Sequence, residues 1–197
     1  MTELQQLINE LCPNGVKLVA LEECCKILDN KRKPVTKAAR QAGEYPYYGA
    51  NGIQDYVSDY IFDGIFVLVG EDGSVVTPSG NPVVNWATGK IWVNNHAHIL
   101  KVHDDNCYGF IAYLLEAGDY SVFITGSAQP KLSQFNLMRF PIVIPPLVEQ
   151  QKIEAYLDEK CSAIDALIRE KKSLLSELEI YKRSLILETV TGKRKVV

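Results

Sequence analysis

The chain has 197 residues, of which 47% are hydrophobic and 23% are charged. These values are typical of a globular protein with one or two domains, and they exclude a disordered or low-complexity chain. No apolar run is long enough to cross a bilayer, and residues 2–11 lack the basic flank and apolar core of a signal peptide. Five cysteines, with Cys24 and Cys25 adjacent, favour a reducing environment. We therefore expect a cytoplasmic protein that does not contact a membrane.

Positive charge is unevenly distributed. Residues 1–145 contain 11 basic and 15 acidic residues, whereas residues 146–197 contain 10 and 9. Nearly half of the basic residues of the first part lie in one segment of ten residues, namely Lys31, Arg32, Lys33, Lys37 and Arg40. A domain that binds nucleic acid by itself usually has an overall basic surface. If the chain contacts DNA or RNA, we expect it to do so through local patches, or together with a partner that supplies more positive charge.

The first 44 residues predict short elements. Residues 2–11 carry Leu4, Leu7, Ile8 and Leu11 at helical spacing, and Cys-Pro-Asn-Gly at 12–15 predicts a turn. A short strand is expected at 16–19 and a second short helix at 21–28. Residues 29–44 are polar and basic and predict a surface loop.

Residues 45–144 predict a sheet with one helix. Runs rich in β-branched and aromatic residues predict strands at 45–48, 65–69, 83–87, 90–93 and 97–102. Turn sequences separate them at 49–52, 71–74, 78–81 and 88–89. The remaining predicted elements are a helix at 108–116 that ends before Gly118, a strand at 120–124, a polar loop at 125–134 and a strand at 141–144.

The chain changes character after Pro145 and Pro146. No Pro or Gly interrupts residues 147–191, which predicts one helix about 65 Å long at 1.5 Å per residue. Apolar residues recur at alternating steps of four and three, as in the seam of a coiled coil. The eleven seam positions, eight of them apolar, are Ile153, Leu157, Lys160, Ile164, Leu167, Lys171, Leu174, Leu178, Tyr181, Leu185 and Glu188. We expect a projecting helix that needs a partner; the alternative is a helix that lies against its own domain.

Five blocks of sequence follow one another along the chain. They are Leu-Cys-Pro-Asn-Gly-Val at 11–16; Tyr-Pro-Tyr-Tyr-Gly-Ala-Asn-Gly at 45–52 with Phe-Asp-Gly at 62–64 and Gly-Glu-Asp-Gly-Ser at 70–74; Trp-Val-Asn-Asn-His-Ala-His-Ile-Leu at 92–100; Gly-Ser-Ala-Gln-Pro-Lys-Leu at 126–132; and Pro-Ile-Val-Ile-Pro-Pro at 141–146 before Glu-Gln-Gln-Lys-Ile at 149–153. In this order the blocks resemble the specificity (S) subunits of type I restriction-modification systems.

The resemblance implies a DNA sequence-specificity subunit with no catalytic activity and no cofactor. Such subunits anchor methyltransferase (modification) subunits and, through them, ATP-driven restriction subunits. The implied fold is α+β, with a β-rich target recognition domain at 1–145. Residues 146–197 then form the long helix, which pairs as an antiparallel coiled coil, and a short basic tail.

Family members usually have two recognition domains, each followed by a long helix, and the paired helices set the distance between two half-sites. This chain has one of each, so it is either a natural half-subunit or part of a longer one. If a second copy supplies the missing helix, the resulting homodimer has an isologous interface. It would read the same half-site twice, as an interrupted palindrome in double-stranded DNA.

Three segments carry the side chains that contact phosphates and base edges: residues 31–40, 79–90 and 125–134. The candidate DNA-binding residues are Lys31, Arg32, Lys33, Lys37, Arg40, Asn81, Asn85, Thr88, Lys90, Ser127, Gln129 and Lys131. Because the third segment overlaps a block shared by the family, Gln129 and Lys131 are expected to touch the DNA backbone. The first two segments are better candidates for specificity, and for each single residue the alternative is a solvated loop.

No catalytic or metal site is predicted. Asn81-Pro82-Val83-Val84 lacks the aromatic end of an adenine methyltransferase motif, and there is no phosphate-binding loop. The spacing of His96, His98, His103 and Cys107 fits no common zinc signature, so these histidines are expected to be structural. The alternative function is a helix-mediated interaction module that docks on the modification subunit without reading DNA.

Overall fold

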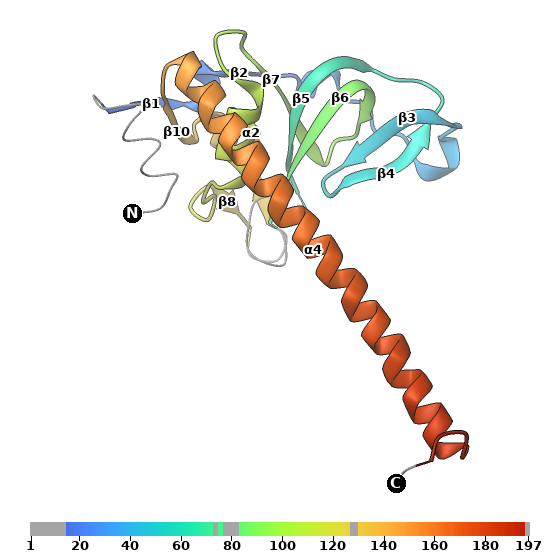
Figure 1. The fold of residues 1–197 in the computed structure, drawn as a ribbon. Coiled ribbons are helices and arrows are strands. Elements are labelled where there is room, and N and C mark those ends of the chain that lie inside the picture. The colour runs from blue at the N-terminus through green and yellow to red at the C-terminus, as the bar shows by residue number, and fades with distance from the viewer. Residues whose placement is uncertain (1–14, 73–74, 77–82, 127–129, 196–197) are drawn as a thin grey trace. The chain divides into compact units, whose positions relative to one another are not determined.

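The computed structural model describes residues 15–72, 75–76, 83–126 and 130–195 (Figure 1). The helix predicted at 2–11 and the turn predicted at 78–81 lie outside the described residues, as do most of the turn at 12–15 and half of the turn at 71–74. Residue contacts divide the chain into two units, residues 1–154 and 155–197. The domain boundary at residue 145 stays a prediction.

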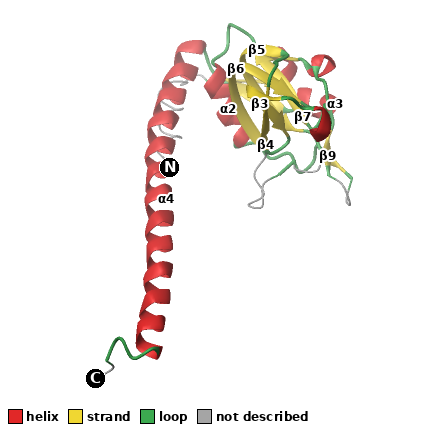
Figure 2. Ribbon diagram, turned by 90° about the vertical axis from the view of Figure 1, so that its right-hand side faces the viewer, coloured by secondary structure: helices red, strands yellow, loops and turns green. Residues whose placement is uncertain are grey.

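The first unit is built around a six-stranded sheet with the strand order β2-β7-β5-β6-β3-β4. Figure 2 shows the strands in yellow. In that order the strands are Cys25–Ile27, Ala97–Val102, Phe62–Gly70, Val84–Val93, Ala42–Gly49 and Gly52–Val57. All neighbours are antiparallel except β3 and β6, which are parallel. This sheet brings β2 beside β7 and β3 beside β6.

Besides the large sheet, the described part of the first unit contains two small sheets, three single turns of 3₁₀-helix and the short helix α3. β1 (Lys17–Ala20) pairs with β10 (Pro141–Ile144), and β8 (Ile124–Thr125) pairs with β9 (Lys131–Leu132). Three single turns of 3₁₀-helix are η1 (Leu21–Glu23), η2 (Asp29–Lys31) and η3 (Lys37–Ala39), and α3 spans Gln134–Met138. The first candidate DNA-binding segment therefore contains η3 and the end of η2.

The central strand β5 is buried on both faces. Side chains alternate along a strand, so Phe66 and Leu68 point to one face and Val67 and Val69 to the other, and all four are at most 4% exposed. Phe66 and Leu68 belong to a core cluster with side chains of β3, β6 and β7. The helix α2 (Tyr108–Glu116) contacts β5 and β6. Such burial is the main stabilising contribution to a fold of this size.

Several predicted elements are confirmed with the expected bounds. α2, β7 and β10 begin and end at the predicted residues, and α4 runs over 44 residues, Leu147–Val190. The strands predicted at 16–19, 45–48 and 65–69 are found as β1, β3 and β5. A β-rich domain with a long C-terminal helix confirms the α+β class. The pairing of that helix as a coiled coil stays a prediction.

Other predicted elements are wrong. The helix at 21–28 is replaced by η1 and β2, because Cys25 and Ile27 pair with Val102 and Leu100 of β7. The strand at 120–124 is mostly a turn, and β4 was not predicted. The turn at 88–89 does not end a strand, because Gly89, with φ of 77°, stays in register with Gly64 of β5. Glycine tolerates this backbone conformation without breaking the ladder.

The helix α4 belongs to both units. Its buried residues are Gln150 and Ile153, and both lie in the first unit. At 1.5 Å per residue the helix is about 66 Å long. Among the described residues, no helix combines the length and the apolar composition that crossing a membrane requires.

Candidate nucleic-acid interface

The basic segment 31–40 contains two kinds of cation. Lys31, Lys33 and Lys37 are exposed. Arg32 is only 12% exposed, because its guanidinium lies 2.7 Å from Glu71 Oε2 and 3.2 Å from Asp29 Oδ2. These internal partners give Arg32 a structural role, and only the three lysines are free to meet a phosphate.

Arg40 is also held inside the protein. Its guanidinium lies over the ring of Tyr47, 4.0 Å from the centroid, and its Nη1 is 3.4 Å from Asp55 Oδ2. Arg40 Nε donates to the carbonyl of Val35 at 3.1 Å. The arginine side chain therefore fastens η3 to β3 and β4.

The backbone of the segment is fastened to the sheet as well. Trp92 Nε1 donates to the carbonyl of Lys33 at 2.6 Å, and Val35 N donates to Tyr47 Oη at 3.1 Å. A hollow of about 150 Å³ lies beside these contacts. Its lining is aromatic and polar, formed by Val35, Ala39, Arg40, Gln41, Tyr47, Val57, Ser58, Asp59 and Trp92. The exposed lysines thus stand on a backbone that is fixed against β3 and β6.

The second candidate segment contributes Lys90 and Thr88, which are exposed beside Gly89. Lys90 Nζ lies 4.7 Å from the ring centroid of Tyr60 and 5.8 Å from that of Tyr45. Such cation–π contacts orient an ammonium group without neutralising it. Tyr45 is two residues from Tyr47, so Lys90 and the basic segment contact the same strand, β3.

Asn85 and Asn81 differ from these residues. Asn85 is partly buried, and its Nδ2 donates to the carbonyl of Ala50 at 3.4 Å, so its amide supports the turn between β3 and β4. Asn81 lies outside the described residues, together with Ser127 and Gln129 of the third segment. Lys131 is described: its side chain is 51% exposed, and its Nζ is 3.1 Å from Glu71 Oε1.

A partly buried ionic cluster underlies these segments. It consists of Asp29, Arg32, Glu71, His98 and Lys131. His98 is 1% exposed, with Nδ1 2.5 Å from Asp29 Oδ2 and Nε2 2.8 Å from the carbonyl of Leu132. Burial raises the pKa of Glu71, but hydrogen bonds and charges from Arg32, His98 and Lys131 outweigh it and hold the pKa below its ordinary value. The sequence motifs did not point to Asp29 or to Glu71 as members of a site.

Asp29, Glu71 and His98 also have the chemistry of a metal site, because one ligand atom of each lies within 4.8 Å of the others. However, the guanidinium of Arg32 already binds both carboxylates. An arginine that compensates the two negative charges makes a cation unnecessary. His96 and His103 make other contacts, with Asp72 Oδ1 at 2.5 Å and the carbonyl of Glu23 at 3.2 Å.

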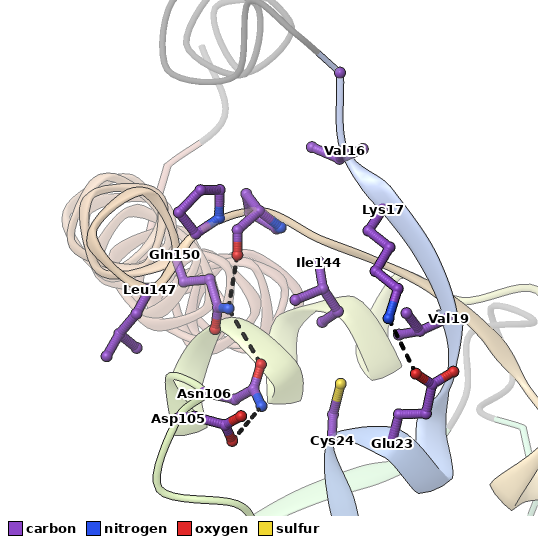
Figure 3. Close-up of a pocket in the computed structure, with 13 residues that line it drawn as sticks. Val16, Lys17, Val19, Glu23, Cys24, Asp105, Asn106, Ile144, Leu147 and Gln150 are labelled. Atoms are coloured by element: carbon purple, nitrogen blue, oxygen red, sulfur yellow. Dashed lines mark hydrogen bonds and ion pairs between the residues drawn. The ribbon is translucent and has the colours of Figure 1, made fainter.

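A second cleft lies at the beginning of α4 (Figure 3). It has a volume of about 580 Å³ and is lined by β1, η1, the loop before α2 and the first turn of α4. Gln150, 1% exposed, donates to the carbonyl of Pro145 at 2.9 Å and to Asn106 Oδ1 at 3.2 Å, and accepts from Cys107 N at 2.8 Å. The buried amide therefore anchors the first turn of α4 to the loop before α2.

Cys107 is the N-cap of α2, and its thiol donates to the carboxylate of Glu154. Burial and this neighbouring carboxylate raise the pKa of Cys107 to about 11. A thiol with such a pKa is protonated at neutral pH and is a poor nucleophile. This pair fastens α4 to α2.

In the second unit, α4 exposes a row of large apolar side chains. The predicted seam residues among them, 45–57% exposed, are Ile164, Leu167, Leu174, Leu178 and Tyr181. Ile168 and Leu175, which the seam did not include, widen this row; with Ile164, Leu167, Lys171 and Lys172 they line a shallow groove of about 370 Å³. Leu157 and Leu185 are half-buried and Lys160 is exposed. Ile153, in contrast, is 3% exposed in the core of the first unit, so the exposed row begins after it.

Solved structures share this fold. A chain from a structure that describes complex assembly and conformational transition of the type I R-M system matches with a TM-score of 0.70 at 18% identity, over 94% of this chain and 50% of that chain. The HsdS subunit from Thermoanaerobacter tengcongensis matches with a TM-score of 0.61 at 20% identity, over 94% and 49%. A type I restriction-modification S subunit from M. genitalium gives 0.61 at 17% identity, over 92% and 47%. The architecture is thus that of type I specificity subunits.

Curated relatives agree with the fold. S.HindORF215P of Haemophilus influenzae, described as a type I restriction enzyme specificity subunit, is 41% identical over 138 residues, which are 70% of this chain and 35% of that protein. The EcoprrI specificity subunit of Escherichia coli is 30% identical over 115 residues, 58% of this chain and 27% of that protein. The chain thus spans about a third of the length of these relatives. Residues 13–177 match the sequence model of the type I restriction modification DNA specificity domain, and the chain belongs to that family.

Proposed function

We propose that this chain is the DNA specificity component of a type I restriction-modification system and reads one half of a bipartite target. The observation that carries the proposal is the family match over residues 13–177, which includes the sheet domain and most of α4. On this proposal the chain has no catalytic role. It docks methyltransferase subunits and, through them, restriction subunits. The free cysteines Cys24, Cys25, Cys107 and Cys161 support a reducing, cytoplasmic setting.

The DNA contacts that we propose are made by exposed cations. Lys31, Lys33 and Lys37 project from a segment that Trp92 and the two arginines fasten to the sheet, and Lys90 stands on the Tyr45–Tyr60 pair. Lysines on a rigid backbone position a domain on DNA through its phosphates. Thr88, exposed on β6 two residues before Lys90, is our candidate for a base or sugar contact. Because residues 1–145 carry more acidic than basic residues, we propose that tight binding needs the methyltransferase subunits.

A homodimer through α4 is the second part of the proposal. The exposed row on α4 leaves large apolar side chains in water, and burying each one is worth about 1.5–3 kcal/mol. The chain spans 47–50% of the solved chains that it matches. A second copy, paired antiparallel, would supply a second recognition domain, and the target would be an interrupted palindrome. In the alternative arrangement, the helix of a different recognition domain covers the row.

The test is co-expression of the chain with the methyltransferase subunits, followed by mapping of methylated sites and a gel shift with the mapped target. We expect specific binding only when the methyltransferase subunits are present, and a target with two identical half-sites. Methylation that does not depend on this chain, or a complex that assembles without target preference, would instead identify a module that docks without reading DNA. Two unlike half-sites would identify a different partner domain.

A further inference from the structure

Two cations from different candidate DNA-binding segments converge on one carboxylate. Arg32, from segment 31–40, places Nη1 2.7 Å from Glu71 Oε2, and Lys131, from segment 125–134, places Nζ 3.1 Å from Glu71 Oε1. The Glu71 side chain is only 13% exposed. Because β5 ends at Gly70, Glu71 also begins the connection that leads to the second segment. One side chain thus joins the first and third segments.

The backbone of Glu71 strengthens the same junction. Leu132 N donates to the carbonyl of Glu71 at 2.8 Å, and Glu71 N donates to the carbonyl of His96 at 2.9 Å. The carbonyl of Leu132 in turn accepts from His98 Nε2 at 2.8 Å. Leu132 directly follows Lys131 in β9, so the base of the β8–β9 hairpin is fixed by both its backbone and its lysine.

The remaining groups leave little freedom to the arginine. Arg32 Nη1 also donates to the carbonyl of Ala97 at 2.7 Å, and Asp29 Oδ1 accepts from Ile99 N at 3.0 Å. Removing the charge of Glu71 would leave Arg32 with Asp29 as its one carboxylate partner among the described residues, and Lys131 with none. Loss of one carboxylate is unfavourable for Arg32, whose side chain is only 12% exposed. Lys131, which is half-exposed, would no longer be held at Glu71, so we expect the two segments to rearrange.

We propose that Glu71 is a positioning residue for DNA recognition, which holds segment 31–40 and the β8–β9 hairpin in the arrangement that reads the target. In this role the ammonium group of Lys131 binds the carboxylate of Glu71 and does not contact a phosphate. The inference rests on the proposed function, because it assigns the way in which the recognition segments are held. In this role Glu71 affects which DNA sequence is preferred, whereas the electrostatic attraction of the complex to DNA does not depend on it.

The first test compares Lys131→Gln with Lys26→Gln, an exposed lysine of β2, in the complex with the methyltransferase subunits. Binding to target and non-target duplexes is titrated at several salt concentrations. For K131Q we expect preference for the target to fall about tenfold, the size of one good base contact, with an unchanged dependence of log Kd on log salt. A salt slope smaller by about one would mean that Lys131 binds a phosphate, and would overturn the proposal.

The second test is a double-mutant cycle with Glu71→Gln, Lys131→Gln and the combined variant. We expect the combined variant to lose no more target preference than E71Q alone, because both changes break the same tie. Independent, multiplying losses would overturn the proposal. The melting temperature of each variant is measured as well. A variant that has lost stability in general has a lower melting temperature, and K131Q is compared with wild type for both melting temperature and target preference. If E71Q fails to fold, the salt slope of K131Q still decides.

The two proposals fail in different ways. A wild-type complex that does not distinguish target from non-target DNA contradicts the proposed function and the inference with it. A wild-type complex that does distinguish them, with variants that retain its full preference, contradicts only the role of Glu71.

Discussion

The first unit, which contains the six-stranded sheet, and the second unit differ in how far they bury their apolar side chains. In the first unit, most apolar residues of β5, β6 and β7 are buried, and buried polar groups such as His98 and Gln150 have hydrogen-bond partners in the same unit. In the second unit, α4 exposes Ile164, Leu167 and Leu178 by more than half. The first unit thus contains its own core, whereas the second unit leaves large apolar side chains exposed, and we propose that another chain or segment covers them.

The largest expected effect comes from changing the exposed apolar residues of α4. We expect a dimer of about 44 kDa, twice the chain mass of 22.1 kDa, that becomes monomeric or aggregates when Ile164, Leu167 and Leu178 are changed to Asp. Each change places a charge where about 1.5–3 kcal/mol of apolar burial is expected. Static light scattering measures the mass. The matched control changes Ser162, Ser173 and Ser176 to Asp, and a wild-type monomer at tens of micromolar would exclude the homodimer.

The next effect sharpens the difference between exposed and internal cations in the sheet domain. Changing Lys31 and Lys37 to Gln should weaken DNA binding by the assembled complex and reduce the slope of log Kd against log salt by about two, or about one for each phosphate that a lysine no longer neutralises. The control pair is Lys26→Gln with Lys101→Gln, exposed cross-strand neighbours on β2 and β7. Equal slopes for the two pairs would mean that the basic segment is a solvated surface.

A third effect concerns the ionic cluster and acid. Since the folded-state pKa of Glu71 lies below its ordinary value of 4.5, its ionised form stabilises the folded chain above pH 4.5. That contribution should be lost as the pH falls through the folded-state pKa. In urea unfolding between pH 3 and 7, we expect Glu71→Gln to be less stable at neutral pH and to lose less stability on acidification. Glu22→Gln, at an exposed position of η1, is the control; an acid dependence as steep in E71Q as in wild type would contradict the cluster.

The smallest effect tests the attachment of α4 to α2. Because burial and Glu154 raise the pKa of Cys107 to about 11, alkylation of this thiol by iodoacetamide at pH 8 should be slow. Glu154→Gln should lower the pKa and increase the rate severalfold, measured on the Cys107 peptide by mass spectrometry. Glu159→Gln, at an exposed position of the same helix, should leave the rate unchanged. An unaltered rate in E154Q would mean that burial alone protects the thiol.

The sequence by itself predicted the elements whose signals are local. α2, β7, β10 and the uninterrupted helix α4 follow from helical spacing, strand composition and prolines within a few residues. The order of five sequence blocks predicted the family. The exposed lysines of segment 31–40 were also predictable, because clustered charge normally lies on a surface.

The tertiary structure decided the elements and contacts whose partners are far apart in the chain. Residues 25–27 form a strand because β7, more than seventy residues later, offers free backbone groups. Arg32 resembles its lysine neighbours in sequence, yet it is internal because Glu71 lies 39 residues away in sequence and 2.7 Å away in space. Ile153 likewise leaves the helical seam to join the core of the first unit. Local pattern does not determine which of several similar side chains finds a partner, because that depends on where the folded chain places the opposite charge or the apolar surface.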